Sequence, residues 1–199
     1  MSSAARIRAV TVSERRARER AERERLIVRV ARELAESEGW DAVTVRRLAD
    51  RVEYSQPVLY SHFQGKAAIV RAVALNGFTD LARQLHAARE TASSRRALRA
   101  VSAAYLRFAA EHPAVYEAMF EMPSDVPFAS DDTPEPLRAC FAAFTSALPA
   151  GTRDIDLAAE VVWSALHGLA ALARDGRIPP QHQDARLDLL LSRLAGKNQ

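Results

Sequence analysis

The sequence predicts an all-α protein of about nine helices arranged in two domains. Apolar residues recur at intervals of three and four along most of the chain, and no segment alternates apolar and polar residues as a half-buried strand does. Clusters of Pro, Gly and Ser separate the helical segments. With 199 residues, 48% of them hydrophobic, the chain is long enough to bury a core in each domain.

A long first helix is predicted from the N-terminal segment. Residues 11–14 read Thr-Val-Ser-Glu, a capping box that predicts a helix start near Val12. An apolar stripe begins at Leu26, and Gly39 ends the helix. Residues 1–20 are polar and charged, and are either a separate charged arm or an extension of this helix.

Residues 44–66 read as two short helices joined by a tight turn and closed by an aromatic, basic end. Thr44 is a good N-cap for the first of them, and the Ser55 hydroxyl is expected to cap the second, with Pro57 in its first turn. Leu59 and Phe63 are spaced to face inward. The outward-facing residues of the second helix are Gln56, Pro57, Val58 and Tyr60. This arrangement is a helix-turn-helix, in which the second helix enters the major groove of DNA.

The charge of the chain is distributed unevenly. Residues 1–66 contain 14 Lys and Arg against 10 Asp and Glu, whereas residues 67–199 contain 14 against 15. This asymmetry is consistent with a polyanionic partner and equally with a solvated helix face. A single cysteine, Cys140, excludes an intrachain disulfide and fits a reducing cytoplasm. The longest charge-free apolar run near the C-terminus, 161–173, is shorter than the roughly 20 residues needed to cross a bilayer, so no membrane partner is expected.

The remaining residues, 69–199, predict a second helical domain. Pro-rich and acidic residues make 122–136 a loop. Helices are expected at about 67–89, 95–111, a short segment from Pro113, 135–148, 154–174 and 180–195. The sequence thus predicts three parts: a charged N-terminal segment at 1–20, the helix-turn-helix domain at 21–68, and the second helical domain at 69–199.

Aromatic and Met residues are concentrated between positions 103 and 167. At helical spacing each of them is more often part of a core, yet as a set they could line an apolar pocket between helices. The candidates are Tyr105, Phe108, Tyr116, Met119, Phe120, Phe141, Phe144, Trp163 and His167. His167 is either a hydrogen-bonded core histidine or a ligand contact. No metal site, cofactor or catalytic motif is predicted.

The segment 161–173 also bears on assembly. Because it is apolar all round, we expect it to be buried on every side, and a second subunit could cover it. The candidate residues for a homodimer interface are Ala165, Gly168, Leu172, Leu187, Leu190, Leu191 and Leu194.

Three motifs in the first third of the chain carry a family resemblance. They are Gly39-Trp40, Thr-x-Arg-x-Leu-Ala over 44–49, and Leu-Tyr-x-His-Phe-x-x-Lys over 59–66. Residues 26–75 therefore resemble the DNA-binding domain of the TetR (tetracycline-repressor-like) family of bacterial transcriptional regulators. The Trp-x3-His-Gly-Leu pattern at 163–169 partially resembles the C-terminal subclass of that family termed WHG.

The resemblance implies roles for the residues of the helix-turn-helix. Phosphate and backbone contacts would come from Thr44, Tyr60, His62 and Lys66. Base contacts would come from Arg46, Gln56, Pro57 and Val58, with Ser55 beside them at the start of the recognition helix. Alternatively, Tyr60 and His62 simply cap and pack the small domain, and Arg46 is solvated.

Glu53 departs from the family pattern, since many relatives have Gly between the two helices of the motif. A residue with a Cβ tolerates a left-handed turn poorly, and Glu adds negative charge near DNA.

The resemblance implies a cytoplasmic homodimer that binds double-stranded operator DNA and is released by a small apolar or aromatic effector of unknown identity. The alternative is a helical small-molecule binding protein whose DNA binding is vestigial.

Overall fold

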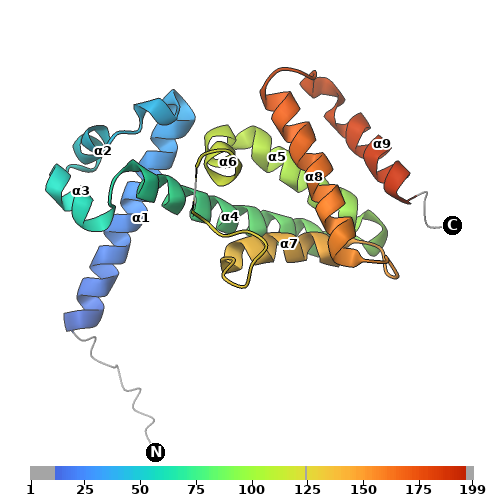
Figure 1. Cartoon of the computed structure of the whole chain (residues 1–199), viewed down its shortest axis with the longest axis horizontal. Helices are drawn as coiled ribbons and strands as arrows, with labels where there is room; N and C mark the ends of the chain where they lie inside the picture. The colour runs from blue at the N-terminus through green and yellow to red at the C-terminus, as the bar shows by residue number, and fades with distance from the viewer. Residues whose placement is uncertain (1–11, 124, 196–199) are drawn as a thin grey trace, which may run out of the picture. The chain divides into compact units, whose positions relative to one another are not determined.

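The computed structural model describes residues 12–123 and 125–195, and these contain nine α-helices and no strand (Figure 1). The predicted all-α class is confirmed. The chain divides into two compact units between Ile69 and Val70. The first 11 residues, more than half of the predicted charged segment, lie outside the described residues, and residues 12–20 are helical.

The first unit is a three-helix arrangement followed by the start of a fourth helix. Helix α1 spans Val12–Glu38, α2 spans Val45–Val52, and α3 spans Gln56–His62. Its core is formed by buried apolar side chains from all three helices: Ile27, Ala31, Leu34, Leu48, Ala49, Val52 and Leu59. Helix α2 packs against both α1 and α3 (Figure 1), so α2 fixes the orientation of α3 within this unit.

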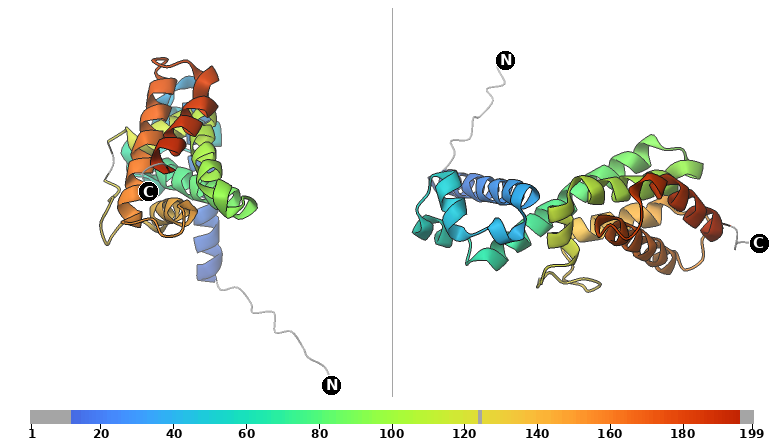
Figure 2. Two further views of the ribbon diagram at one scale, coloured as in Figure 1. Left: turned by 90° about the vertical axis from the view of Figure 1, so that its right-hand side faces the viewer. Right: turned by 90° about the horizontal axis from the view of Figure 1, so that it is seen from above.

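The second unit consists of six helices, the first of which, α4, begins in the preceding unit. The bounds are α4 Lys66–Thr91, α5 Ala97–Glu111, α6 Pro113–Phe120, α7 Glu135–Ala147, α8 Ile155–Arg174 and α9 Gln183–Ala195. Helix α5 is the centre of this unit, because α6, α7, α8 and α9 all pack against it (Figure 2).

Close packing between α4 and α6 depends on Gly77. A Cβ added to Gly77 would lie 2.5 Å from Cγ1 of Val115 and 2.7 Å from Sδ of Met119. These distances are below van der Waals contact, so even an alanine would force the side chains of Val115 and Met119, or the helices that carry them, to shift.

Helix α8 is only partly buried within the single chain. Ala159, Val162 and Leu166 face the core, whereas Leu157 is 58% exposed and Val161 is 48% exposed. The expectation that this segment is buried on every side is therefore wrong for one chain. The expectation of no membrane span rested on the run 161–173, but the whole helix has 20 residues and contains an 18-residue stretch with a mean hydropathy of 1.4, which meet the length and composition criteria for a span. These criteria are weak for a single helix, since core helices of soluble proteins also meet them.

Candidate nucleic-acid interface and ligand cavity

Thr44 orders the start of α2 and separates the roles of its arginines. Its hydroxyl accepts a hydrogen bond from the backbone N–H of Arg47 at 3.2 Å, so the predicted cap is confirmed. The guanidinium of Arg47 lies 2.9 Å from both carboxylate oxygens of Glu38, and Arg51 pairs with the same carboxylate at 3.1 Å. Arg46 is exposed and has no partner among the described residues. Of these arginines, Arg46 is thus the one available for an external contact.

Glu53 occupies the turn between α2 and α3 in the left-handed conformation, with φ 58° and ψ 36°. The backbone N–H groups of Glu53 and Tyr54 both donate to the carbonyl of Ala49, the latter at 3.0 Å. This pattern ends a helix with a residue that is usually Gly. The departure from the family pattern therefore leaves the left-handed turn in place and adds conformational strain instead.

Helix α3 presents a small exposed surface. Leu59 is buried and holds the helix against the core of the first unit, while Gln56 and Pro57 are exposed, Val58 is 39% exposed and Tyr60 is 53% exposed. At the start of the helix, a backbone carbonyl rather than a side chain accepts the hydrogen bonds of the first N–H groups. The Ser55 carbonyl accepts from the N–H of Val58 at 3.0 Å, and the Ser55 hydroxyl makes no capping hydrogen bond. The predicted Ser55 cap is wrong, and this exposed hydroxyl joins the outward-facing surface.

The structure gives partners within the chain to two predicted phosphate contacts, one of them buried and the other half-buried. The His62 side chain is only 5% exposed, and its Nδ1 lies 3.3 Å from Oε1 of Glu24 on α1. The ammonium of Lys66 donates to the backbone carbonyl of Trp40. The DNA contact predicted for His62 is corrected accordingly: the imidazole packs α3 on α1. Lys66 joins the start of α4 to the turn after α1.

The charged half of α1 has a structural task that the sequence pattern did not reveal. The Arg20 guanidinium donates to the Ser61 carbonyl at the end of α3 at 2.9 Å, and it also pairs with Glu24 at 2.9 Å. Glu24 in turn contacts His62. These contacts join α1 to the C-terminal end of α3, and the 41-residue separation between Arg20 and Ser61 explains why no local signal predicts them.

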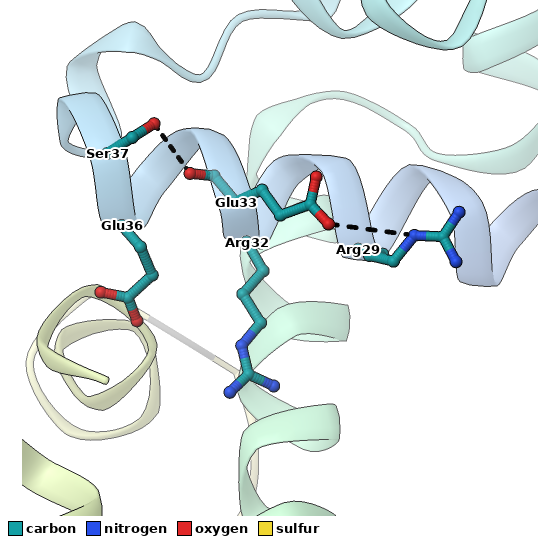
Figure 3. A pocket seen from close by; sticks show the side chains of 5 residues that line it. All are labelled: Arg29, Arg32, Glu33, Glu36 and Ser37. Atoms are coloured by element: carbon teal, nitrogen blue, oxygen red, sulfur yellow. Dashed lines mark hydrogen bonds and ion pairs between the residues drawn. The ribbon is translucent and has the colours of Figure 1, made fainter. Parts of the chain in front are cut away.

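A hollow on the surface of α1 is lined by Arg29, Arg32, Glu33, Glu36 and Ser37, all from that one helix (Figure 3). The Arg29 guanidinium lies 4.0 Å from the Glu33 carboxylate, and the Ser37 hydroxyl donates to the Glu33 carbonyl at 2.8 Å. These are ordinary contacts of an exposed helix face. They do not enclose a ligand.

The second unit contains a cavity of about 970 Å³ between α4, α5, α6, α7, α8 and the loop before α7. Five of the nine predicted pocket residues line it: Tyr105, Phe120, Phe141, Phe144 and Trp163. Phe78, Phe128 and Cys140 also line it, and the predicted pocket did not include them. Burial raises the pKa of the Cys140 thiol to about 12, so the thiol is protonated and unreactive at neutral pH.

Four predicted pocket residues lie outside the lining of this cavity. Phe108 is fully buried in the packing of α5, and Met119 packs against Gly77. Tyr116 and His167 lie behind the wall of the cavity, where they belong to a polar chain. The predicted pocket is corrected for these four.

A chain of hydrogen bonds runs from the cavity wall to His167. Trp163 Nε1 donates to the hydroxyl of Tyr105 at 3.1 Å, the hydroxyls of Tyr105 and Tyr116 lie 2.7 Å apart, and the Tyr116 hydroxyl lies 2.6 Å from Nδ1 of His167. Burial raises the pKa of both tyrosines, so both hydroxyls stay protonated. Burial lowers the pKa of His167, although the nearby Glu121 carboxylate opposes this shift. The neutral imidazole is therefore favoured.

The candidate dimer residues differ in their placement. Leu187 is only 1% exposed and belongs to the core of its own chain, so its assignment to an interface is corrected. Leu172 is exposed, and Ala165, Gly168, Leu190 and Leu191 are half-buried. Leu189, which the sequence analysis did not select, is exposed. The side chain of Leu194 lies outside the described residues.

Within residues 12–123 and 125–195, no group of three or more His, Cys, Asp or Glu side chains could hold a metal ion.

Comparison with known proteins agrees with the helix-turn-helix and the helical second unit. Residues 27–73 match the family of bacterial regulatory proteins named tetR, and residues 98–194 match the tetracyclin repressor-like C-terminal domain. An HTH-type transcriptional regulator of Mycobacterium tuberculosis is 29% identical over 171 residues, which cover 85% of this chain and 78% of that protein. The class C tetracycline repressor of Escherichia coli is 44% identical over 48 residues, 24% of this chain and 22% of the repressor.

A solved structure has the same fold across both units. The structure of BioQ with its double-stranded DNA operator superposes with a TM-score of 0.64 at 22% identity, covering 87% of this chain and 98% of that one. The two family matches together span the helix-turn-helix and most of the second unit. The chain belongs to the tetR family of bacterial regulatory proteins.

Proposed function

We propose that the protein is a cytoplasmic, homodimeric transcriptional repressor that binds a palindromic DNA operator and is released by a small-molecule effector. Family membership and the helix-turn-helix support DNA binding.

The observation that carries the proposal is the exposed surface of α3. Ser55, Gln56, Val58 and Tyr60 are exposed on a helix that Leu59 fixes from behind. An exposed row of this kind on a firmly held second helix is suited to reading bases in a major groove. Arg46 is the candidate for a base or phosphate contact from α2, while Thr44 and Lys66 remain candidates for phosphate contacts.

The apolar surface of α8 and α9 supports a dimer. Leu157, Val161 and Leu172 on α8 and Leu189 on α9 are exposed in the single chain. Exposed apolar side chains of this kind on two helices are typical of a subunit interface. A two-fold dimer would present two copies of α3 to half-sites about 34–36 Å apart.

The cavity in the second unit is the candidate effector site. Its volume of about 970 Å³ and its aromatic wall suit a drug-sized ligand. An effector that binds one arrangement of the dimer better than the other would change operator affinity by about 5- to 150-fold, the usual range of allosteric coupling. The protein is proposed to have no catalytic activity and no membrane partner. The vestigial alternative has lost its support, because Glu53 adopts the left-handed turn that the motif requires.

In vitro selection of DNA sites with the purified full chain tests this function. We expect an enriched palindrome, and a gel shift on it that weakens steeply as salt increases because phosphate contacts release counterions. Selection of no sequence, or binding that does not depend on salt, would refute the regulator. The effector part is tested separately by screening small molecules for release of the selected DNA.

A further inference from the structure

We propose that the cavity of the second unit selects a ligand that carries positive charge beside an apolar or aromatic body. The regulatory meaning of this ligand depends on the proposed function, but its binding does not. The inference comes from the charged groups that line the cavity together with its aromatic wall.

Acidic groups outnumber basic groups around the cavity. Asp131, Asp156 and Glu160 line it, against a single cation, Arg138. None of the three carboxylates has an ion-pair or hydrogen-bond partner among the described residues. Arg138 donates to the Thr133 carbonyl, which holds its guanidinium on the loop before α7. The cavity is therefore negative in sum, and an anionic ligand would be repelled.

The arrangement of α8 places this charge beside aromatic rings. Asp156 and Glu160 are four residues apart, so their side chains are neighbours on one helix face. Trp163 follows on the same face and also lines the cavity. A cation held near these carboxylates would thus also lie near an aromatic ring, whose face attracts cations through its quadrupole.

The apolar part of the lining suits the uncharged part of such a ligand. It is formed by four aromatic rings from three helices: Phe78 of α4, Phe120 of α6, and Phe141 and Phe144 of α7. A body of several rings would bury apolar surface there. A small hydrophilic cation would not, so the structure favours a lipophilic one.

The test compares two ions that have nearly the same shape and opposite charge. Tetraphenylphosphonium and tetraphenylborate are titrated separately into the purified full chain by calorimetry. We expect the phosphonium to bind at least about tenfold more tightly at low ionic strength, from several part-exposed charge contacts that each contribute a few-fold. Its advantage is expected to shrink with added salt. Equal affinity, tighter binding of the borate, or no saturable phosphonium binding would overturn the proposal.

Substitutions locate the charge contacts. Glu160→Gln combined with Asp156→Asn is expected to weaken phosphonium binding by about tenfold, because each part-exposed pair contributes a few-fold, and to leave borate binding equal or tighter. Asp132→Asn combined with Glu135→Gln is the matched control, since it removes the same two charges from exposed residues that do not line the cavity. An equal loss in both variants would assign the effect to the overall charge of the protein and overturn the cavity site.

A gel shift of the selected operator separates this inference from the proposed function. Operator binding without phosphonium binding would refute the cationic ligand and leave the regulator standing. Phosphonium binding without any operator binding would support the cavity site and refute the regulator.

Discussion

Glu53 is held in a backbone conformation that its side chain disfavours. An L-residue with a Cβ in the left-handed region costs roughly 1–2 kcal/mol relative to the right-handed helix. The two hydrogen bonds to the Ala49 carbonyl and the burial of Val52 and Leu59 on either side keep the turn in this form. The strain lies between the two helices that would contact DNA.

Glu53→Gly should stabilise the protein. Removing the Cβ relieves the strain, and part of this gain is offset by the extra freedom of Gly in the unfolded chain, so we expect about 0.5–1 kcal/mol in the free energy of unfolding. Urea denaturation measures it. Asp50→Gly is the matched control, because Asp50 is an exposed residue inside α2, and there the same substitution should destabilise by about 0.5–1 kcal/mol. Destabilisation by both would show that Glu53 is not strained.

Arg46 and Arg47 are neighbours with different expected effects on DNA affinity. Arg46→Ala should weaken operator binding by about 1–3 kcal/mol if its guanidinium contacts a base, and change the free energy of unfolding by less than about 0.5 kcal/mol. Arg47→Ala removes the same charge from a side chain that Glu38 already holds. A gel shift measures the operator affinity of both variants. Equal losses of affinity would indicate a general charge effect and contradict a specific contact by Arg46.

The hydrogen-bonded chain from Trp163 to His167 joins two residues of α8, one that lines the cavity and one that does not, through Tyr105 of α5 and Tyr116 of α6. Its members come from three helices, α5, α6 and α8, and the buried tyrosines have no alternative partners in water. A ligand that displaced Tyr105 or Trp163 would change the partner of every following group. These hydrogen bonds therefore connect a change at the cavity wall to His167, which does not line the cavity.

The stability of the second unit should fall as the pH decreases below the ordinary histidine pKa. Folding lowers the pKa of His167, so between that value and about 6.5 the unfolded chain binds a proton that the folded chain does not. Above about pH 6.5 the imidazole is neutral in both the folded and the unfolded state, so it does not make the free energy of unfolding depend on pH. Thermal unfolding at pH 5.5 and 7.5 should show this loss, and it should be smaller in His167→Gln. His182→Gln is the control, because His182 is exposed and takes no part in the hydrogen bonds from Trp163 to His167. This variant should keep the full loss of stability at low pH.

Local patterns predicted the helices and the surface of α3, but not the contacts between distant helices. The Thr44 cap, the buried Leu59 and the outward row from Gln56 to Tyr60 follow from spacing of three and four residues, and the structure agrees. His62 has the same exposure pattern in sequence, yet Glu24, 38 residues away, holds it inside. Leu187 likewise belongs to a core that spacing within α9 cannot distinguish from an interface. Helical periodicity shows which face is apolar and not which partner covers it.

A homodimer would bury the apolar surface that one chain leaves exposed on α8 and α9. Within the described residues, Leu157, Val161 and Leu189 stay about half exposed. Small residues along the same helix, among them Ala165 and Gly168, would allow close approach of a second α8. An interface of this kind also sets the spacing of the two DNA-reading helices, so dimer formation and operator binding should be lost together.

Val161→Glu should convert the protein to a monomer. A carboxylate placed in a dry interface costs several kcal/mol unless it is paired, whereas at 48% exposure it is tolerated by the single chain. Sedimentation equilibrium at micromolar concentration measures the change, and gel shift should show the accompanying loss of operator binding. Val12→Glu is the control, as Val12 is similarly exposed on α1. A Val161 variant that remains dimeric would place the interface elsewhere.

The chain has two tryptophans, and each compact unit contains one of them. Trp40 is buried beside the turn after α1, and Trp163 lines the cavity of the second unit. Intrinsic emission can therefore be assigned to either unit by replacing a single indole. With Trp40→Phe, the remaining signal comes only from the cavity wall. The same optical measurement can then follow cavity occupancy, or with Trp163→Phe the opening of the helix-turn-helix, without any attached dye.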